Sequence, residues 1–445
     1  MSEATRAPGG TELRPGTVRF ALQRIGSLFQ LLELDTRLLG MIGALIVIWV
    51  GFNIMSEGSF LTPRNLWNLS VQTSSIAIMA TGMVLIIVSR NIDLSVGSML
   101  GLVGYTMALV QTIWIPTYLG FGHGQPWIWI VALAVGIILG ALIGAFQGSI
   151  VAYGGVPSFI VTLGGLLIWR GLIFRLGQQG QTITPTDSTF HLIGGGPIGS
   201  IGGVPSWIVG IVACVAIVYL LVSSRRRRQK YGFPVRPVWA AVTLGVVGCA
   251  IVLGAVWVAN SYPWPPALAT RYAVEHNITE PPGGLIIPTG IAYPVLIMIG
   301  VTIVMTYMAT RRRFGRYVYA IGGNPDAAEL GGINVKRTIV STYMVIGILV
   351  AISAAIQVGR LNGAVTGLGV QNELDVIAAA VIGGTSFAGG IGTIPGAILG
   401  AVVMQSLRSG MLLLNVDSPT QDIVLGIVLV GAVGLDAVLR RRTSR

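Results

Sequence analysis

The chain has 445 residues, of which 53% are hydrophobic and 10% are charged, with a formal net charge of +12. Soluble domains carry about 25% charged residues, so a soluble globular fold is excluded for most of this chain. Nucleic acid is excluded as a partner, because binding it requires a basic face on a soluble fold, whereas the Lys and Arg residues here lie between and beyond apolar stretches.

The chain begins with a polar, arginine-bearing segment, 1–37, before the first apolar run. This segment is too long and too weakly hydrophobic for a cleaved signal peptide. A membrane-spanning helix needs roughly 20 predominantly apolar residues. Twelve candidate windows follow, at approximately 38–56, 70–89, 94–113, 127–150, 158–176, 206–223, 237–259, 290–310, 338–359, 376–391, 394–414 and 421–439. The sequence therefore predicts an all-α integral membrane protein, a polytopic bundle of about 12 transmembrane helices (10–12) at 38–439.

The positions of Lys and Arg orient these helices, because cytoplasmic connections carry an excess of both. If the N-terminus is cytoplasmic, 22 of the 28 basic residues lie on the cytoplasmic side and three lie on the opposite side. The remaining three fall within spans or at their ends. This asymmetry predicts that both termini are cytoplasmic, including the tail 440–445.

The hairpin at 206–259 carries four consecutive arginines, 225–228, at its cytoplasmic turn. Such a cluster serves as an orientation signal or contacts anionic membrane lipid. A contact with a partner protein is the other interpretation. The two cysteines, Cys214 and Cys249, lie in apolar stretches of this hairpin. We expect both cysteines to face lipid or to pack as small residues. Their positions exclude a disulfide framework and a metal site.

A 27-residue cytoplasmic loop, 311–337, separates the eighth and ninth spans. Asn324 is a good N-cap, Pro325 suits the first helical position, and Asp326 suits the positive end of a helix. Gly331 and Gly332 end the pattern. The sequence predicts a short, capped helix of about two turns. Because plain connections between helices need only roughly 2–8 residues, we expect this loop to contact a partner.

Several short runs spread over most of the chain are typical of one family: Asn91-Ile92-Asp93-Leu94-Ser95-Val96-Gly97, Val156-Pro157-Ser158-Phe159-Ile160-Val161-Thr162-Leu163-Gly164, Gly315-Arg316, Ala320-Ile321-Gly322-Gly323-Asn324-Pro325-Asp326-Ala327-Ala328, Gly332-Ile333-Asn334-Val335, Gly383-Gly384-Thr385-Ser386 and Gly389-Gly390-Ile391-Gly392. With these runs, the sequence resembles the permeases of bacterial monosaccharide ABC importers of the ribose and xylose type, kin to the branched-chain amino acid permeases. The hairpin at 206–259 departs from the shorter ribose-type members and is more similar to the longer xylose-type ones.

The resemblance implies a permease of the bacterial inner membrane that binds no cofactor itself, with ATP and Mg²⁺ used by a partner ATPase. It further implies a periplasmic sugar-binding protein, a second permease copy in a homodimer, and alternating access as the transport mechanism. Membrane lipid is the remaining partner. The loop segment that the resemblance assigns to ATPase coupling contains Gly322, Gly323, Asn324, Pro325, Asp326, Ala327, Ala328, Glu329 and Gly332.

Polar residues inside spans are costly and usually face a cavity or another helix. The candidates for a solute path are Gln72, Asn91, Asp93, Ser158, Thr162, Gln357, Thr385 and Ser386. Helix packing or a bond back to the backbone is the competing interpretation of each hydroxyl. The glycine-rich stretch 383–392 predicts a broken helix, which lipid tolerates only where protein buries it or where it lines a cavity.

Asn91-Ile92-Asp93-Leu94 and Asn372-Glu373-Leu374-Asp375 resemble one another and are predicted on opposite sides of the membrane. That is the relation expected of an inverted repeat. N-capping of two helices is the simpler explanation of both runs.

Three functional classes compete. The chain has no GxxxxGK[ST] nucleotide motif, so an ABC permease would depend on another chain for ATP. An ion-coupled secondary transporter, the alternative, would place ionisable residues within its spans. A membrane enzyme needs a catalytic constellation, and the three histidines, His123, His191 and His276, all lie in predicted external loops. A transport subunit that is not itself an enzyme is therefore expected.

Overall fold

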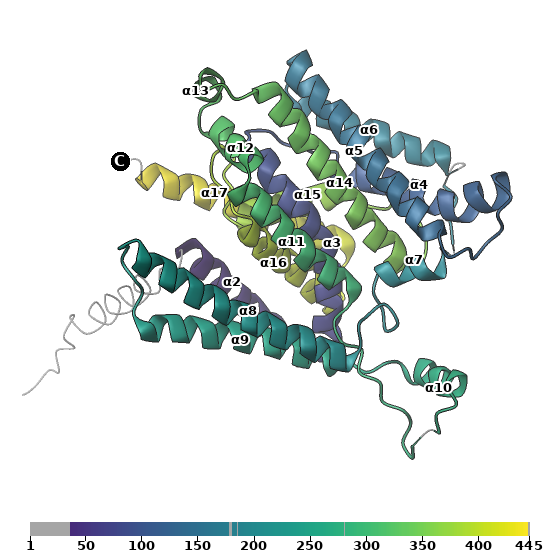
Figure 1. The fold of residues 1–445 in the computed structure, drawn as a ribbon. Helices are drawn as coiled ribbons and strands as arrows, with labels where there is room; N and C mark the ends of the chain where they lie inside the picture. The colour runs from purple at the N-terminus through teal and green to yellow at the C-terminus, as the bar shows by residue number, and fades with distance from the viewer. Residues whose placement is uncertain (1–35, 178–179, 185, 280, 444–445) are drawn as a thin grey trace, which may run out of the picture. The chain divides into compact units, whose positions relative to one another are not determined.

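The computed structural model describes residues 36–443, except 178–179, 185 and 280. In these ranges the chain forms helices joined by irregular segments, with isolated β-bridges in place of any sheet. Figure 1 shows the elements, which are α2 (Thr36–Met55), α3 (Pro63–Val88), α4 (Val96–Leu109), the π-helix η1 (Val110–Tyr118), α5 (Ile128–Gly154), α6 (Ser158–Leu176), α7 (Ser188–Ile193), α8 (Gly203–Lys230), α9 (Val238–Asn260), α10 (Pro266–Glu275), α11 (Tyr293–Arg311), α12 (Arg313–Gly323), α13 (Pro325–Leu330), α14 (Val335–Leu361), α15 (Asn372–Ile382), α16 (Ile394–Leu413) and α17 (Ser418–Thr443).

Ten helices in the described ranges are long and apolar enough to cross a membrane. This confirms the all-α, multi-pass membrane fold, whereas twelve spans and cytoplasmic termini stay predictions. The ten are α2, α3, α4 with η1, α5, α6, α8, α9, α11, α14 and α16. The predicted segment 1–37 lies almost wholly outside the described residues, as does the end of the predicted tail 440–445.

The chain divides into two compact units. The smaller includes Gly210–Gly254, which is most of the α8–α9 hairpin, and the larger includes Gly40–Val209 and Ala255–Arg445. Within the hairpin, the Cys214 sulfur lies 3.9 Å from the backbone oxygen of Cys249, and the Cys249 sulfur lies 4.0 Å from that of Cys214. The cysteines are therefore small residues packed between two helices. Every site described below belongs to the larger unit.

The larger unit is built around α3. Of the most apolar 18-residue window of α3, 94% is buried inside protein, compared with 0% for α2. A helix that is apolar all round belongs in an interior, and α11, α14, α15 and α16 all pack against α3. The hydroxyls of Thr73 and Ser74 donate to the backbone oxygens of Leu69 and Ser70, so these buried polar groups are satisfied within the helix.

A stripe of glycines brings α5 close to α14. Gly140, Gly144 and Gly148 recur every four residues and therefore share one face of α5. A Cβ atom added at Gly140 would collide with the backbone oxygen of Gly347, and one added at Gly144 would collide with that of Tyr343. Helix association in lipid depends on small residues that allow such approach, which accounts for the glycines within the apolar runs.

Replacing Gly144 with alanine tests this packing. Alanine favours a helix over glycine by about 1 kcal/mol, but its methyl group would overlap the Tyr343 carbonyl. We expect a net loss of about 1–3 kcal/mol in the free energy of unfolding, measured by denaturation in detergent. Gly300→Ala on α11 is the matched control, because an added Cβ there meets no atom within 4 Å. Equal stability of the two variants would contradict the contact.

Two long helices are each followed by a break and then by a second helix. α3 is followed by α4, and α14 by α15. The pairing is crossed, because α4 packs against α14 and α15 packs against α3. The first turn of α4 meets the break after α14 where Gly97 and Gly369 approach each other's backbone oxygens. This crossed arrangement is the one an inverted repeat would produce, and the repeat itself stays a prediction.

The predicted span 376–391 is not a single helix. α15 ends at Ile382, and residues 383–393 are irregular. This window is therefore not one continuous helix, and the predicted break is confirmed. Its physical cause is glycine: Gly384 and Gly389 adopt φ angles of +88° and +86°, which residues with a Cβ rarely reach.

Candidate functional site

A cavity of about 290 Å³, here named the polar cavity, lies between α3, α14, α15 and α16. Polar side chains inside a membrane bundle are expected to face such a space. Its size is close to the lower limit of small-molecule sites, about 300 Å³. Its polar and charged lining residues are Gln72, Ser75, Gln357, Arg360, Asn372, Asp375, Gln405 and Arg408.

Two of the predicted path residues, Gln72 and Gln357, come together in the polar cavity although they are far apart in sequence. The Gln357 amide donates to the Ser75 hydroxyl at 2.8 Å, and the Ser353 hydroxyl donates to the backbone oxygen of Ser75 at 2.9 Å. These bonds hold α3 against α14 and fix the orientation of Gln357. Its amide oxygen remains available as an acceptor for a polar solute.

A buried ion pair closes one wall of the polar cavity. Arg408 on α16 meets Asp375 on α15 through two contacts, Nη2 to Oδ1 at 2.9 Å and Nε to Oδ2 at 2.8 Å. The Asp375 side chain is 5% exposed. Only the Nη2 contact has hydrogen-bond geometry, so one charge-assisted hydrogen bond and one close ion contact join the two side chains. The same pair lines a second, smaller cavity of about 70 Å³ that also contains Gln371 and Asp422, so it forms a partition between two spaces.

Sequence reasoning missed this pair. Arg408 falls inside a predicted span and Asp375 at the start of one, but neither was selected for the path. The signal available was the presence of an arginine in an apolar window, since an ionisable residue inside a membrane requires a partner.

Four other predicted path residues, Asn91, Asp93, Ser158 and Thr162, gather at the break between α3 and α4. The Ser158 hydroxyl accepts a hydrogen bond from the Ile92 N–H at 3.3 Å, and the Thr162 hydroxyl donates to the Ile92 oxygen at 3.3 Å. The Asn91 amide donates to the Ser89 oxygen at 3.0 Å. These side chains provide hydrogen-bond partners for backbone groups that lie outside any helix, which lipid could not do.

Asp93 is completely buried at this break. Its Oδ1 accepts hydrogen bonds from the Ser95 N–H at 2.8 Å and the Ser95 hydroxyl at 2.7 Å. Burial raises the pKa of the Asp93 carboxyl above its ordinary value, and the two bonds from Ser95 oppose that rise. The carboxyl thus holds the turn before α4 through Ser95, the N-cap residue, and its Oδ2 has no hydrogen-bond partner.

The last two predicted path residues, Thr385 and Ser386, lie buried in the irregular segment 383–393. The Ser386 N–H donates to the Ile391 oxygen at 2.9 Å, and the Ser386 hydroxyl accepts from the Ala388 N–H at 3.2 Å. The eight predicted residues therefore occupy three separate places, and two of them line the polar cavity.

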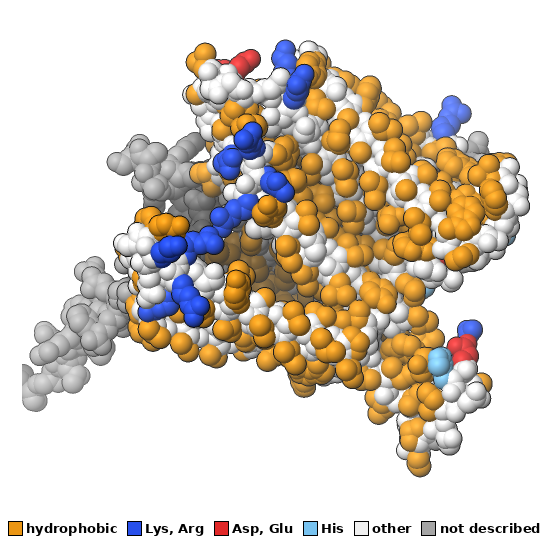
Figure 2. All heavy atoms as spheres, in the orientation of Figure 1, with side chains coloured by type: hydrophobic (Ala, Val, Ile, Leu, Met, Phe, Trp, Pro, Cys, Tyr) orange, Lys and Arg blue, Asp and Glu red, His pale blue; other side chains and the backbone are white. Residues whose placement is uncertain are grey.

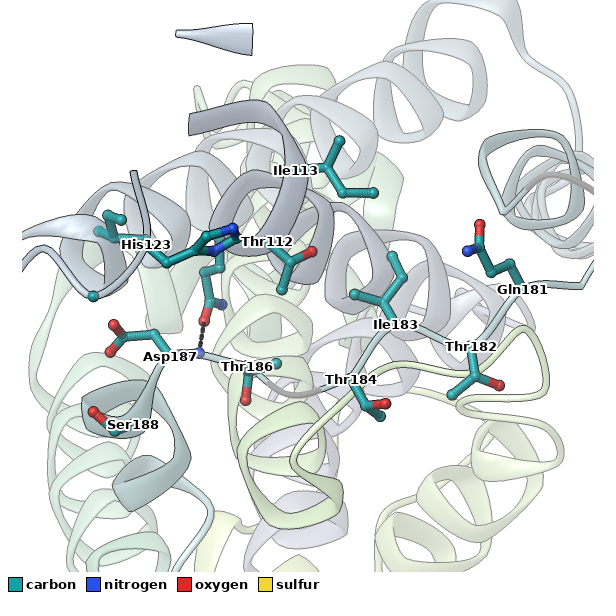
Figure 3. A pocket seen from close by; sticks show the side chains of 13 residues that line it. Thr112, Ile113, His123, Gln181, Thr182, Ile183, Thr184, Thr186, Asp187 and Ser188 are labelled. Atoms are coloured by element: carbon teal, nitrogen blue, oxygen red, sulfur yellow. Dashed lines mark hydrogen bonds between the residues drawn. The ribbon is translucent and has the colours of Figure 1, made fainter. Parts of the chain in front are cut away.

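A larger cavity of about 500 Å³, here named the outer cavity, lies beside η1 (Figure 3). η1 contains Pro116, which lacks an N–H and so favours the wider winding of a π-helix. Figure 3 shows threonines of the segment 181–188 along the cavity, with the Asp187 N–H donating to the Gln111 side chain at 3.1 Å. Sequence reasoning selected none of these residues.

The end of α14 separates the two cavities. Arg360 and Leu361 line the polar cavity. The next residue, Asn362, accepts hydrogen bonds from the Thr186 N–H at 3.2 Å and the Thr186 hydroxyl at 3.0 Å in the wall of the outer cavity. Polar side chains at the end of α14 therefore lie next to both cavities: Arg360 lines the polar cavity, and Asn362 binds Thr186 in the wall of the outer cavity.

The predicted short helix of the loop 311–337 is present as α13. Asn324 caps it, with its side chain accepting from the Ala327 N–H at 3.1 Å, and Pro325 occupies the first turn. Ala328 is 6% exposed and holds the helix to the protein, whereas Leu330 is 91% exposed. Asp326 and Glu329 are also exposed. Acidic and hydrophobic side chains are visible together over α13 in Figure 2.

α13 follows an amphipathic helix, α12, that sequence reasoning did not predict. Its buried side chains, Val318 and Ile321, lie against the bundle, and the exposed Arg313 and Arg316 face away. α12 packs against α3, α11 and α14. The spacing of Phe314, Val318 and Ile321 at helical intervals was the available signal. Figure 1 shows α12 and α13 at the end of the larger unit where α14 begins. We name this the coupling end.

Comparison with known proteins places the chain in a family. The model of the branched-chain amino acid transport system / permease component matches residues 65–226 and 241–433. The xylose transport system permease protein of Escherichia coli strain K12 is 37% identical over 96% of this chain and 99% of its own length. The corresponding protein of Haemophilus influenzae is 36% identical over 93% and 100%. The ribose import permease protein of Escherichia coli strain K12 is 33% identical over 88% and 92%.

No solved structure matches the chain. The family match covers both halves of the bundle, including α3, α14, α15 and the coupling end. The relatives that match it over nearly their whole length are named as permease proteins of sugar transport systems. This chain therefore belongs to the family of branched-chain amino acid transport system permease components.

Proposed function

We propose that this chain is the membrane-spanning subunit of an ATP-driven importer for a monosaccharide, xylose or a related pentose or hexose. The observation that carries the proposal is the identity of 37% to a xylose permease over 96% of the chain. The exposed, capped helix α13 supports it, because a chain whose ATP is hydrolysed elsewhere needs a surface through which that hydrolysis acts. Leu330, at 91% exposure, offers an apolar side chain that a partner could cover.

The proposed assembly contains two copies of this permease, two copies of a cytoplasmic ATPase and a periplasmic sugar-binding protein. The permease binds no cofactor, and ATP and Mg²⁺ belong to the ATPase. When the ATPase subunits close on ATP, α13 is displaced, and the bundle alternates between outward-open and inward-open forms. Both termini are cytoplasmic in this arrangement, and the coupling end faces the cytoplasm.

The polar cavity is the proposed passage for the sugar. A monosaccharide presents hydroxyl groups that both donate and accept, and the amides of Gln72, Gln357 and Gln405 can do the same. Asp375 and Arg408 add a charged acceptor and donor on one wall. The passage needs weak contacts, because a solute that binds tightly there would leave slowly.

Uptake of radiolabelled xylose by cells that express the whole transport system tests the energy source. We expect depletion of ATP to stop accumulation, and a protonophore that spares ATP to leave the initial rate within about twofold. The alternative is an ion-coupled secondary transporter. The Asp375–Arg408 pair inside the bundle is a structural feature that would suit it. Uptake that stops with the protonophore and survives ATP depletion would establish the alternative.

A further inference from the structure

Three chain segments meet at the coupling end, at the last turn of α3. The Gly390 N–H donates to the Val88 oxygen at 3.0 Å. A Cβ atom added at Gly322, near the end of α12, would collide with that same Val88 oxygen. The Tyr319 hydroxyl on α12 donates to the Gly392 oxygen at 2.7 Å. The end of α12, the end of α3 and the irregular segment 383–393 are thus in direct backbone contact.

Arg90, two residues after the end of α3, has an unusual backbone conformation. Arg90 has a φ angle of +62°, and its N–H donates to the Ile87 oxygen at 2.9 Å, while the Asn91 N–H donates to the Ile86 oxygen at 3.0 Å. These two bonds form a Schellman motif, in which the left-handed position is usually glycine because a Cβ atom is strained there. An arginine at this position is disfavoured by the backbone, which makes the contacts of its side chain informative.

The Arg90 side chain joins α3 to the end of α12. Its Nε donates to the Gly322 oxygen at 2.7 Å, and its Nη2 donates to the Gly323 oxygen at 2.6 Å. The last carbonyls of a helix lack partners within the helix and carry its negative partial charge. The planar guanidinium can reach two adjacent carbonyls at once, which a lysine ammonium does less well. Asn324, the cap of α13, follows Gly323 directly.

The chain also connects α13 directly to α14. It runs through Gly331 and Gly332, and Gly332 has a φ angle of +82°. The Arg90 contact in addition ties the base of α13 to α3, whose first half carries Gln72 and Ser75 of the polar cavity. The geometry points to Arg90 as a positioning residue that transmits displacement of α13 to α3, so that ATP hydrolysis is converted into movement of the cavity wall.

This inference rests on the proposed function, and Arg90→Gly tests it most sharply. Glycine is preferred at the left-handed position of a Schellman motif, so the variant keeps the turn and loses only the side-chain contact. The permease, its ATPase and its sugar-binding protein are reconstituted in proteoliposomes, and sugar uptake and ATP hydrolysis are both measured. We expect normal association with the ATPase and a fall of roughly tenfold in sugar moved per ATP, the loss expected from a charge-assisted contact.

Arg90→Lys keeps the positive charge but lacks the planar guanidinium, and we expect it to recover part of the sugar moved per ATP. Glu57→Gly is the matched control, because Glu57 is an exposed non-glycine residue with a φ angle of +52° at the end of α2. Its ratio should equal that of the wild type. An unchanged ratio in Arg90→Gly, or loss of ATPase association in that variant, would overturn the inference. If the wild-type complex itself imports no sugar with ATP, the proposed function fails, whatever Arg90 does.

Discussion

A permease carrying Glu329→Arg together with Leu330→Ser is expected to remain folded in the membrane and to lose sugar uptake by roughly 30-fold or more. This is the effect of removing an interface hot spot worth about 2 kcal/mol or more. Both side chains are exposed on α13, and Leu330 is 91% exposed. Neither supports the fold, because Ala328 is the buried residue of this helix. Deleting 324–331 should abolish uptake altogether.

The measurement is uptake in whole cells combined with recovery of the ATPase on affinity-tagged permease. Leu119→Ser is the matched control, because Leu119 is a leucine with 64% exposure beyond η1, away from the coupling end. We expect that variant to keep both uptake and ATPase recovery. Unimpaired uptake in the α13 double variant would show that α13 does not couple the two proteins.

Replacing Arg408 with glutamine is expected to destabilise the protein by about 3–5 kcal/mol, because it leaves the Asp375 carboxylate buried without its partner. Asp375 is 5% exposed and receives both contacts from Arg408. Asp375→Asn should have a smaller effect in the same direction, since Arg408, at 26% exposure, can still reach solvent. Thermal unfolding of the purified permease in detergent measures both variants.

The double variant Asp375→Asn with Arg408→Gln separates stability from transport. Removing both charges eliminates the uncompensated one, so we expect most of the lost stability to return. Uptake should stay low, because the polar cavity has lost its charged wall. Single variants as stable as the wild type would contradict the buried pair, and full recovery of uptake in the double variant would remove it from the sugar path.

The features that depend on local sequence could be predicted. The helix α13 is specified within nine residues, 324–332, because its cap, its first-turn proline and its terminal glycines lie close together in the chain. The long spans follow from apolar length alone. The break at 383–393 follows from glycines that permit positive φ angles.

The polar cavity could not be predicted, because its walls come from helices far apart in sequence. Gln357 reaches Ser75 across 282 positions, and Arg408 reaches Asp375 across 33. Asn91, Asp93, Ser158 and Thr162 were selected for the path on polarity alone, yet they form the hydrogen bonds that hold the break after α3. Polarity in a span identifies a need for a partner, and whether that partner is backbone or solute depends on the fold.

The sugar that passes and the assembly that drives it rest on the proposed function. Accumulation of xylose in proteoliposomes that contain this permease, its ATPase and its sugar-binding protein tests that function most directly. We predict that uptake requires ATP inside the vesicles, which is the compartment that the coupling end faces. It also requires sugar-loaded binding protein outside them. Uptake by the permease alone, driven by an imposed ion gradient and indifferent to ATP, would contradict it.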